Sequence, residues 1–462
     1  MKVTQVSLRP TDAAQEAGRP ALTPELLAAV GARYSRNNEG LEAILEKIDP
    51  ENADASVERI FRFVDYGHAS IADMAPVALF IDGISLYLAY YLWTLCPTAG
   101  GQESSTRYIR LNAEGLADPE TLGIPENERA AWNAAMEEAF AAYQSAVTVW
   151  EEIVRADPDV ARIPRSLRED PSEKSKKAVA RMRRNYAFDR ARYFLPVAAT
   201  TNVMLVQSAR AWVNVCQYLL SHPLREANLL GERLRDELAL AAPNLLRHAR
   251  PLESLQKGLA VEQLTVRKWA EDRLDGVLFG ANADGLLLEV FLPPQTIDPL
   301  VTLSLAFHDN RYSYIGATLR RTAVRFGWNR IAFAEIRDLN RHRTGTKYCP
   351  LLPQGFYAAL DELPSPDRAA RIPVGVGVMA TNRAHRLLTS GEATYIYHTL
   401  LGTEFPFEHT TTADKFIYEA ELRTGVGAHY RYAGHLRDIL ALWYERFPAT
   451  KGLILEGSAE PE

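Results

Sequence analysis

Cysteine is scarce in this sequence of 462 residues: Cys96, Cys216 and Cys349 are its only three, and they lie far apart in the chain. The chain therefore has no CxxC pair and no disulfide framework, and a reducing, cytoplasmic environment is expected. The N-terminal residues MKVTQVSLRPTDAAQ lack the apolar core of a signal peptide.

Long uninterrupted apolar runs are absent as well. The longest one, residues 75–93, contains Pro76, Asp82, Gly83 and Ser85. A membrane-spanning helix needs about 20 largely apolar residues, so this run predicts buried structure and no membrane association.

Excess positive charge and several common motifs are also missing. The net charge is −6 and the isoelectric point is near 6.0, which argues against attraction of the whole molecule to nucleic acid or to an anionic membrane. No GxSxG, P-loop or GxGxxG sequence occurs, which leaves nucleophile-elbow hydrolysis and the common nucleotide-binding loops without support. Glu408-His409 and the pair His429 and His435 lack metal-ligand spacing, so no metal site is predicted.

The length predicts more than one domain, because single cores rarely exceed about 250–300 residues. Helical patterns dominate residues 22–250, including an amphipathic helix over 132–154. A connecting segment follows, with a helical pattern over 261–274. From Leu286 a strand is predicted, stopped by Pro293 and Pro294. These boundaries predict an N-terminal domain over 1–255, a connecting segment over 256–284 and a C-terminal domain over 285–462.

The two halves show the same order of parts. An apolar segment leads into a polar turn in each half, IDGISLYLAYYLW into TAGGQESSTRY and WNRIAFAEIRDLN into RHRTGTKY. Each half then has a proline-marked entry to a helix, FLPVAATTNVMLVQSARAW and EFPFEHTTTADKFIYEAEL. Self-similarity without a short period suggests an ancient domain duplication.

Arg341-His342-Arg343 forms a cationic trio behind the apolar segment of the second half. Guanidinium groups are planar, forked donors that stay charged, which suits phosphate or carboxylate binding. A second interpretation is that these arginines only complement the dipole at a helix C-terminus.

The polar segment Glu103-Ser104-Ser105-Thr106-Arg107-Tyr108 supplies a carboxylate, hydroxyls, an arginine and a tyrosine within six residues. Gly100 and Gly101 before it permit unusual backbone angles and close approach of a ligand. The segment can bind a phosphate, or it can be a solvated turn before an edge strand.

Two further features are open to interpretation. His68, at the end of a predicted helix, is a ligand contact or a capping residue. The basic run 174–192 is interpreted as a solvated helix face.

Taken in order, these segments resemble the flavin-dependent thymidylate synthases. The resemblance is carried by GARYS (31–35), GHASIAD (67–73), ESSTRY (103–108), and ARYFLP (191–196) followed by Ser208-Ala209-Arg210. The segment ESSTRY matches the family's ExSxRY substrate motif in full. Several family motifs in the family's order over most of residues 22–245 are more specific evidence of the resemblance than any single motif.

The chain also departs from the family pattern. The family's RHR element normally precedes ExSxRY, but the first half has YYLWTLCPTAGG there, and the trio occurs only in the second half. Arg423 of the second half lies near the place of the family's later substrate-binding arginine. Because the family's sites are shared between subunits of a homotetramer, the resemblance implies composite sites built from both halves, in a homodimer that mimics the tetramer.

The resemblance implies an α+β protein with two tandem domains, each a small mixed or antiparallel sheet packed with helices. It implies reductive methylation of dUMP to dTMP with methylenetetrahydrofolate, FAD and NADPH. The implied flavin-binding residues are Arg341, His342, Arg343, His68, Ser70 and Arg210. The implied substrate-binding residues are Glu103, Ser105, Arg107 and Arg423, and Arg423 would also act in catalysis by polarising the uracil ring.

The sequence is also compatible with two other functions. The replacement of RHR in the first half and the shortened loop after Arg343 are compatible with a related flavoenzyme that acts on another pyrimidine nucleotide or uses another one-carbon donor. The separation of the motifs is also compatible with a catalytically inactive homologue that binds nucleotide without turnover.

Overall fold

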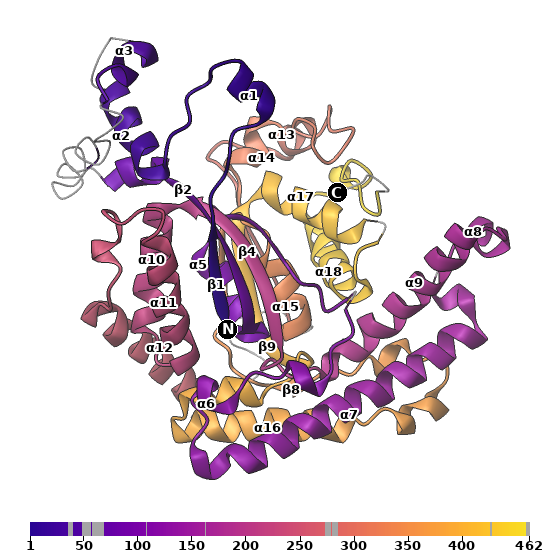
Figure 1. Ribbon diagram of the computed structural model, residues 1–462. Coiled ribbons are helices and arrows are strands. Elements are labelled where there is room, and N and C mark those ends of the chain that lie inside the picture. The colour runs from indigo at the N-terminus through magenta and orange to yellow at the C-terminus, as the bar shows by residue number, and fades with distance from the viewer. Residues whose placement is uncertain are drawn as a thin grey trace. The chain divides into compact units, whose positions relative to one another are not determined.

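The computed structural model describes residues 1–35, 40–48, 57, 69–107, 109–161, 163–272, 279, 285–425 and 427–458 (Figure 1). The chain forms two compact units. Unit 1 comprises Met1–Ser104, Gly115–Arg129 and Ala198–Gln263, and unit 2 comprises Ser105–Glu114, Ala130–Val197 and Leu264–Glu462. No described helix is both long enough and apolar enough to cross a membrane.

Unit 1 contains a four-stranded antiparallel sheet. Its strands, in spatial order, are β1 (Lys2–Val6), β2 (Pro76–Ser85), β4 (Thr200–Ser208) and β3 (Gly100–Glu103). The pairing of β2 with β4 is shifted by a bulge between Asp82 and Ile84, where Gly83 has a φ of 71°. A glycine accepts this backbone conformation without steric cost, and the bulge bends the strand just before its end.

Helices follow the strands of unit 1 directly. The helix α5 (Leu86–Leu95) begins after β2, and the Ser85 side chain caps it by accepting a hydrogen bond from the Leu88 amide. Ser208 caps α10 (Ala209–Ser221) in the same way after β4. The other helices of this unit within the described residues are α1 (Asp12–Glu16), α2 (Pro24–Tyr34), α3 (Leu41–Leu45), α6 (Pro119–Leu122) and α11 (Arg225–Leu238), with α12 (Glu253–Glu271) continuing into unit 2.

Unit 2 contains a second antiparallel sheet. Its spatial order is β5 (Leu286–Phe291), β6 (Ala323–Ala332), β9 (Thr403–Thr412) and β7 (Thr346–Tyr348), and the short β8 (Gly355–Phe356) also pairs with β9. A bulge between Trp328 and Ile331 shifts the pairing of β6 with β9. Again a helix begins straight after each central strand, α15 (Phe333–Asn340) after β6 and α17 (Ala413–Thr424) after β9.

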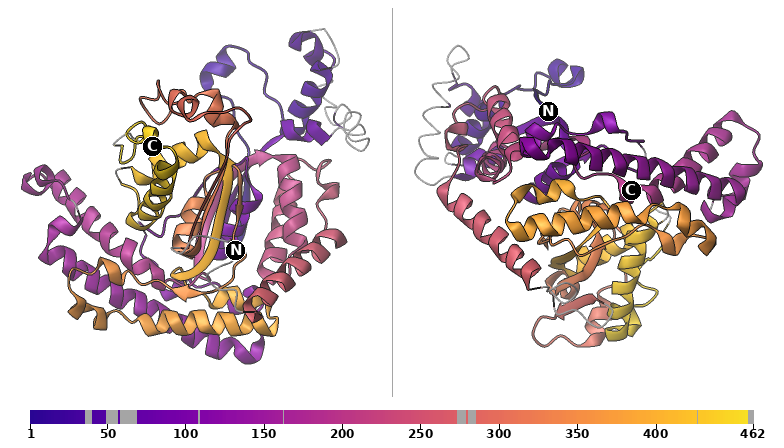
Figure 2. Two further views of the ribbon diagram at one scale, coloured as in Figure 1. Left: turned by 180° about the vertical axis from the view of Figure 1, so that it is seen from behind. Right: turned by 90° about the horizontal axis from the view of Figure 1, so that it is seen from below.

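Long helices from both halves of the sequence belong to unit 2. In Figures 1 and 2, α16 (Val374–Ser390) runs beside α7 (Glu126–Ala156), and Trp132 of α7 donates a hydrogen bond to the Tyr397 carbonyl at 3.0 Å. The other helices of this unit are α8 (Arg165–Glu169), α9 (Glu173–Ala191), α13 (Asp298–Leu303), α14 (Ala317–Arg321) and α18 (Tyr430–Arg446).

The two sheets have the same strand order and the same antiparallel directions, with the third strand of each at the edge next to the fourth. The prediction of an α+β protein with small sheets packed with helices is confirmed. The domain boundaries and the duplication of the chain stay predictions, and the shared strand order favours the duplication. Ala393–His398, just before β9, form a 3₁₀ helix.

Candidate functional site

A cavity of about 770 Å³ in unit 2 brings the polar segment of the first half to the end of α17. Ser105, Arg107 and Arg423 all belong to this unit, together with the trio at 341–343. The polar residues that line the cavity include Arg107, Asn185, Asp189, Arg190, Glu362, Thr424, Tyr430 and Arg437. Arg423 directly precedes the lining residue Thr424. The volume lies in the range of cavities that hold small ligands.

Arg107 is held by a carboxylate. Its Nε and Nη2 donate to the two oxygens of Asp189 at 2.8 and 3.0 Å, and both side chains are largely buried. Burial opposes a charge on Arg107, but Asp189 outweighs it and raises the pKa of the guanidinium. The Ser105 hydroxyl accepts a hydrogen bond from the Arg107 amide, so Arg107 has a defined position at the cavity wall.

Arg423 is held by a histidine. Its Nε donates to Nε2 of His342 at 2.6 Å, and its Nη2 donates to the Asp338 carbonyl at 3.3 Å. Burial lowers the pKa of His342 to about 3, so the imidazole is neutral at pH 7 and its Nε2 is an acceptor. The central member of the cationic trio is therefore uncharged, and its ring supports Arg423.

Tyr432 of α18 connects the two arginines. Nη1 of Arg107 lies 3.5 Å from the Tyr432 hydroxyl, and the Arg423 guanidinium lies 5.3 Å from the centre of the same ring. Tyr432 is 2% exposed, so its ring is packed in the interior of the unit. Arg107 and Arg423 thus contact the same side chain, that of Tyr432, although they are far apart in the sequence.

Asp338 is the charged centre of a second group of contacts. It accepts from Arg192 at 3.0 Å and forms an ion pair with Arg341, one helical turn further on. Burial opposes ionisation of Asp338, but nearby arginines outweigh it and hold the pKa well below its usual range: Arg192, Arg341, Arg107 and Arg423. Asp338 therefore stays ionised and fixes the C-terminal end of α15.

Glu335 lies one turn before Asp338 and has a different environment. It is fully buried, the Tyr193 hydroxyl donates to it at 2.8 Å, and Arg192 lies 3.5 Å away. Burial raises the pKa of Glu335 to about 7 although Arg192 opposes the shift. Two carboxylates on one helix thus differ in charge state near pH 7.

Glu103 and the two glycines before it belong to unit 1. The Trp93 indole donates to the Glu103 carboxylate at 3.1 Å. Neither Gly100 nor Gly101 has a positive φ. A Cβ on Gly101 would lie 2.3 Å from the Met204 carbonyl oxygen, whereas a Cβ on Gly100 would meet no described atom within 4 Å. The close approach at Gly101 is therefore to the backbone of β4.

The other residues assigned to the flavin lie in different places. Ser70 is exposed in a 3₁₀ turn of unit 1, and Arg210 forms a half-exposed ion pair with Asp73 at 2.8 Å. His68 lies outside the described residues. In unit 2, Arg343 is exposed and Arg341 is 30% exposed, so both present guanidinium groups near the surface.

Sequence patterns did not identify Asp189, Asp338 or Tyr432. The basic run 174–192 was interpreted as a solvated face, but its last turn is buried: Arg190 is 7% and Arg192 is 1% exposed. A signal was present, since an aspartate at position 189 among arginines indicates that some of these charges are paired.

The chemistry of these side chains fits an anionic nucleotide better than it fits a metal. Within the described ranges, no group of three or more His, Cys, Asp or Glu side chains is placed to hold a metal ion. Arg341 and Arg343 carry guanidinium groups, which suit the binding of phosphate groups. His342 does not supply a cation, because it is buried and neutral and its Nε2 accepts from Arg423.

Residues 21–244 match the family model described as thymidylate synthase complementing protein. The chain is 22% identical over 476 residues to "UPF0159 protein Ta1429" of Thermoplasma acidophilum, which covers 92% of this chain and 94% of that protein. It is also 22% identical over 229 residues to "Flavin-dependent thymidylate synthase" of Clostridium tetani, covering 49% of this chain and 83% of that protein.

Two solved structures match about half of the chain. One is the flavin-dependent thymidylate synthase ThyX from Helicobacter pylori complexed with FAD and dUMP, with 17% identity and a TM-score of 0.34, covering 54% of this chain and all of that chain. The other is the UMP/dUMP methylase PolB from Streptomyces cacaoi bound with 5-Br dUMP, with 17% identity and a TM-score of 0.33, covering 54% of this chain and 93% of that chain.

Proposed function

Since the chain belongs, through residues 21–244, to the thymidylate synthase complementing protein family, we propose that it is a flavin-dependent enzyme that methylates a uridine nucleotide. The reaction is the conversion of dUMP to dTMP with methylenetetrahydrofolate and NADPH. The observation that supports it most strongly is the meeting of Arg107 and Arg423 on Tyr432 beside the 770 Å³ cavity.

The reaction balances as follows. The methylene carbon of the folate forms a bond to C5 of uracil, and its two bonds to the folate nitrogens break. The C5 proton and one proton from solvent balance the two nitrogens, and a hydride reduces the transferred carbon to a methyl group. FAD reduced by NADPH would supply that hydride when it is bound. Tetrahydrofolate and NADP⁺ are the other products.

The side chains of unit 2 have distinct tasks in this proposal. Arg107 binds the nucleotide, and its pair with Asp189 keeps the guanidinium oriented. Arg423 donates to a uracil carbonyl and stabilises the negative charge that develops on the ring as C5 becomes nucleophilic. Arg341 and Arg343, at the end of α15, would hold the diphosphate of FAD.

His342 acts on Arg423 in this scheme. Its neutral ring accepts from Nε, which leaves the terminal amino groups of Arg423 to face the Asp338 carbonyl and the substrate. An acceptor at this position fixes the plane of the guanidinium, and a correctly oriented donor requires no reorganisation when charge develops. His342 is therefore a positioning residue.

The proposal is tested with purified full-length protein, FAD, NADPH, methylenetetrahydrofolate and dUMP, with dTMP measured by chromatography. We expect turnover, and we expect Arg423→Ala to lower kcat by about 100-fold or more, as for loss of a donor to a developing oxyanion. Arg386→Ala is the control, because Arg386 is an exposed arginine on α16. Failure of the wild-type protein to form dTMP in the presence of bound flavin would overturn the assignment.

A second candidate function is nucleotide binding without turnover. Asp189 and Asp338 already neutralise Arg107 and Arg341 in the structure, which reduces the positive charge available to stabilise negative charge that develops on a bound ligand during turnover. The dTMP assay and a calorimetric titration together separate the candidates. An inactive homologue would bind dUMP in the titration and form no dTMP.

A further inference from the structure

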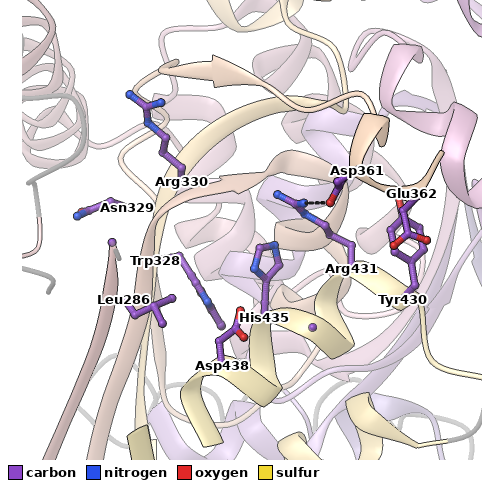
Figure 3. A pocket seen from close by; sticks show the side chains of 12 residues that line it. Leu286, Trp328, Asn329, Arg330, Asp361, Glu362, Tyr430, Arg431, His435 and Asp438 are labelled. Carbon is purple, nitrogen blue, oxygen red and sulfur yellow. Dashed lines mark hydrogen bonds and ion pairs between the residues drawn. The ribbon is translucent and has the colours of Figure 1, made fainter. Parts of the chain in front are cut away.

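A second cavity of unit 2 lies between the end of β6 and the first turns of α18, and its volume is about 600 Å³ (Figure 3). Its wall includes Trp328 and Arg330 from β6, and His435 and Asp438 from α18. None of the residues predicted from the sequence as site residues lines it. It shares Glu362 and Tyr430 with the cavity at Arg107 and is otherwise lined by different residues.

Gly434 leaves space for a ligand at the wall of this cavity. Gly434 lies inside α18, where glycine costs about 1 kcal/mol relative to alanine. A Cβ at this position would have no described atom within 4 Å, so packing does not require glycine here. Gly434 lines the cavity, and any side chain in its place would take up part of that volume.

Three buried polar atoms of the cavity wall lack a hydrogen-bond partner among the described residues. They are Nε1 of Trp328, Nε of Arg431 and Nε2 of His435. The rings of Trp328 and His435 lie 5.6 Å apart, and Trp328 is 2% exposed. A buried donor without a partner is costly, which favours a polar ligand at this wall.

Charged groups of both signs complete the wall. Asp438 forms no hydrogen bond or ion pair with any other residue that the structure describes, and Figure 3 shows it on the same helix as His435. Arg330 is exposed on β6. Arg431 lies over the ring of Tyr357, with its guanidinium carbon 3.4 Å from the ring centre, and is paired with Asp361. The wall thus offers a donor, an acceptor, aromatic faces and a cation.

We propose that this cavity is a second ligand site, for a planar pyrimidinone-type ring that carries an anionic substituent. A ring carbonyl accepts from Nε1 of Trp328, a ring N–H donates to Asp438, and Arg330 binds the anionic substituent. Gly434 leaves the room that the ring occupies. Uridine nucleotides and reduced folates share this chemistry, and binding here requires no turnover.

Calorimetric titration of the full-length protein separates the two sources. dUMP and 5-formyltetrahydrofolate are titrated separately into wild-type protein, Arg107→Ala, Gly434→Leu and Gly258→Leu. Gly258 is the matched control, because it too lies inside a helix with no described atom within 4 Å of its Cβ position, and it does not line this cavity.

We expect at least one of the two ligands to bind to Arg107→Ala, with affinity weakened at least tenfold in Gly434→Leu and unchanged in Gly258→Leu. Trp328→Phe keeps the aromatic face and removes the donor, so it should weaken the same binding event severalfold. Loss of all binding in Arg107→Ala, or equal affinity in Gly434→Leu and Gly258→Leu, would overturn the proposal. Absence of dTMP formation would bear only on the proposed activity.

Discussion

Arg107 and Arg423 contact the same tyrosine: Arg107 reaches the hydroxyl of Tyr432, and Arg423 lies over its ring. The first arginine comes from the polar segment of the N-terminal half and the second from the helix α17 of the C-terminal half. Because all three residues belong to unit 2, the contact brings the two arginines together within a single compact unit, beside the cavity that Arg107 lines.

The ion pair of Arg107 with Asp189 predicts that a second substitution can restore the folding stability of an Arg107 variant without restoring its function. Arg107→Ala leaves Asp189 buried without its partner and should lower the free energy of unfolding by about 3 kcal/mol. Adding Asp189→Asn removes the buried charge and should restore part of that loss, as measured by urea denaturation. The double variant should still form no dTMP, and recovery of turnover would contradict the role of Arg107.

The contact of His342 with Arg423 predicts an effect on turnover. In His342→Leu, Arg423 loses its acceptor, so kcat should fall at least tenfold while the dUMP dissociation constant changes less than threefold. His342→Gln offers an oxygen acceptor near the position of Nε2 and should recover most of the rate. Equal rates for the leucine and glutamine variants would show that His342 contributes only packing.

Glu335 predicts a pH dependence of stability. Its pKa is about 7 in the folded protein and near 4.5 when unfolded, so the folded state binds more protons between these values. Stability contributed by this group is therefore present below pH 4.5 and is lost as the pH rises through 7. Glu335→Gln should be more stable relative to wild type at pH 8 than at pH 5, by about 1–3 kcal/mol.

Asp338→Asn is the opposite control for that experiment. The pKa of Asp338 is held well below its usual range, so its ionised form stabilises the fold at neutral pH and this contribution is lost in strong acid. The variant should be destabilised at pH 7, and the difference from wild type should shrink below about pH 4. Thermal unfolding followed by circular dichroism measures both variants.

Gly100 and Gly101 form a matched pair for a test of strand packing. Gly101→Ala would force a methyl group against the Met204 carbonyl oxygen and should cost about 1–3 kcal/mol by overpacking. Gly100→Ala meets no described atom and should be nearly neutral. Comparable unfolding midpoints for the two variants would contradict the close pairing of β3 with β4.

Much of the fold follows from local patterns. The strand before Pro293 and the amphipathic helix around Trp132 were predicted, because hydrophobic periodicity and proline stops act over a few residues. The strands β2 and β4 of the first half were not predicted, because residues 22–250 were interpreted as mainly helical. The order of the two sheets was not predicted, since strand pairing joins residues far apart in the chain.

The charge states at the candidate site depended on tertiary contacts. Sequence motifs identified Arg107, His342 and Arg423, because their residue types and order resemble a known family. They showed neither that His342 is neutral nor that Arg107 is paired with Asp189, 82 positions away. Burial and the approach of distant charges determine a pKa, and both arise only when the chain packs. Residue identity therefore indicated the chemistry available to this protein, and packing determined which groups carry charge and what they face.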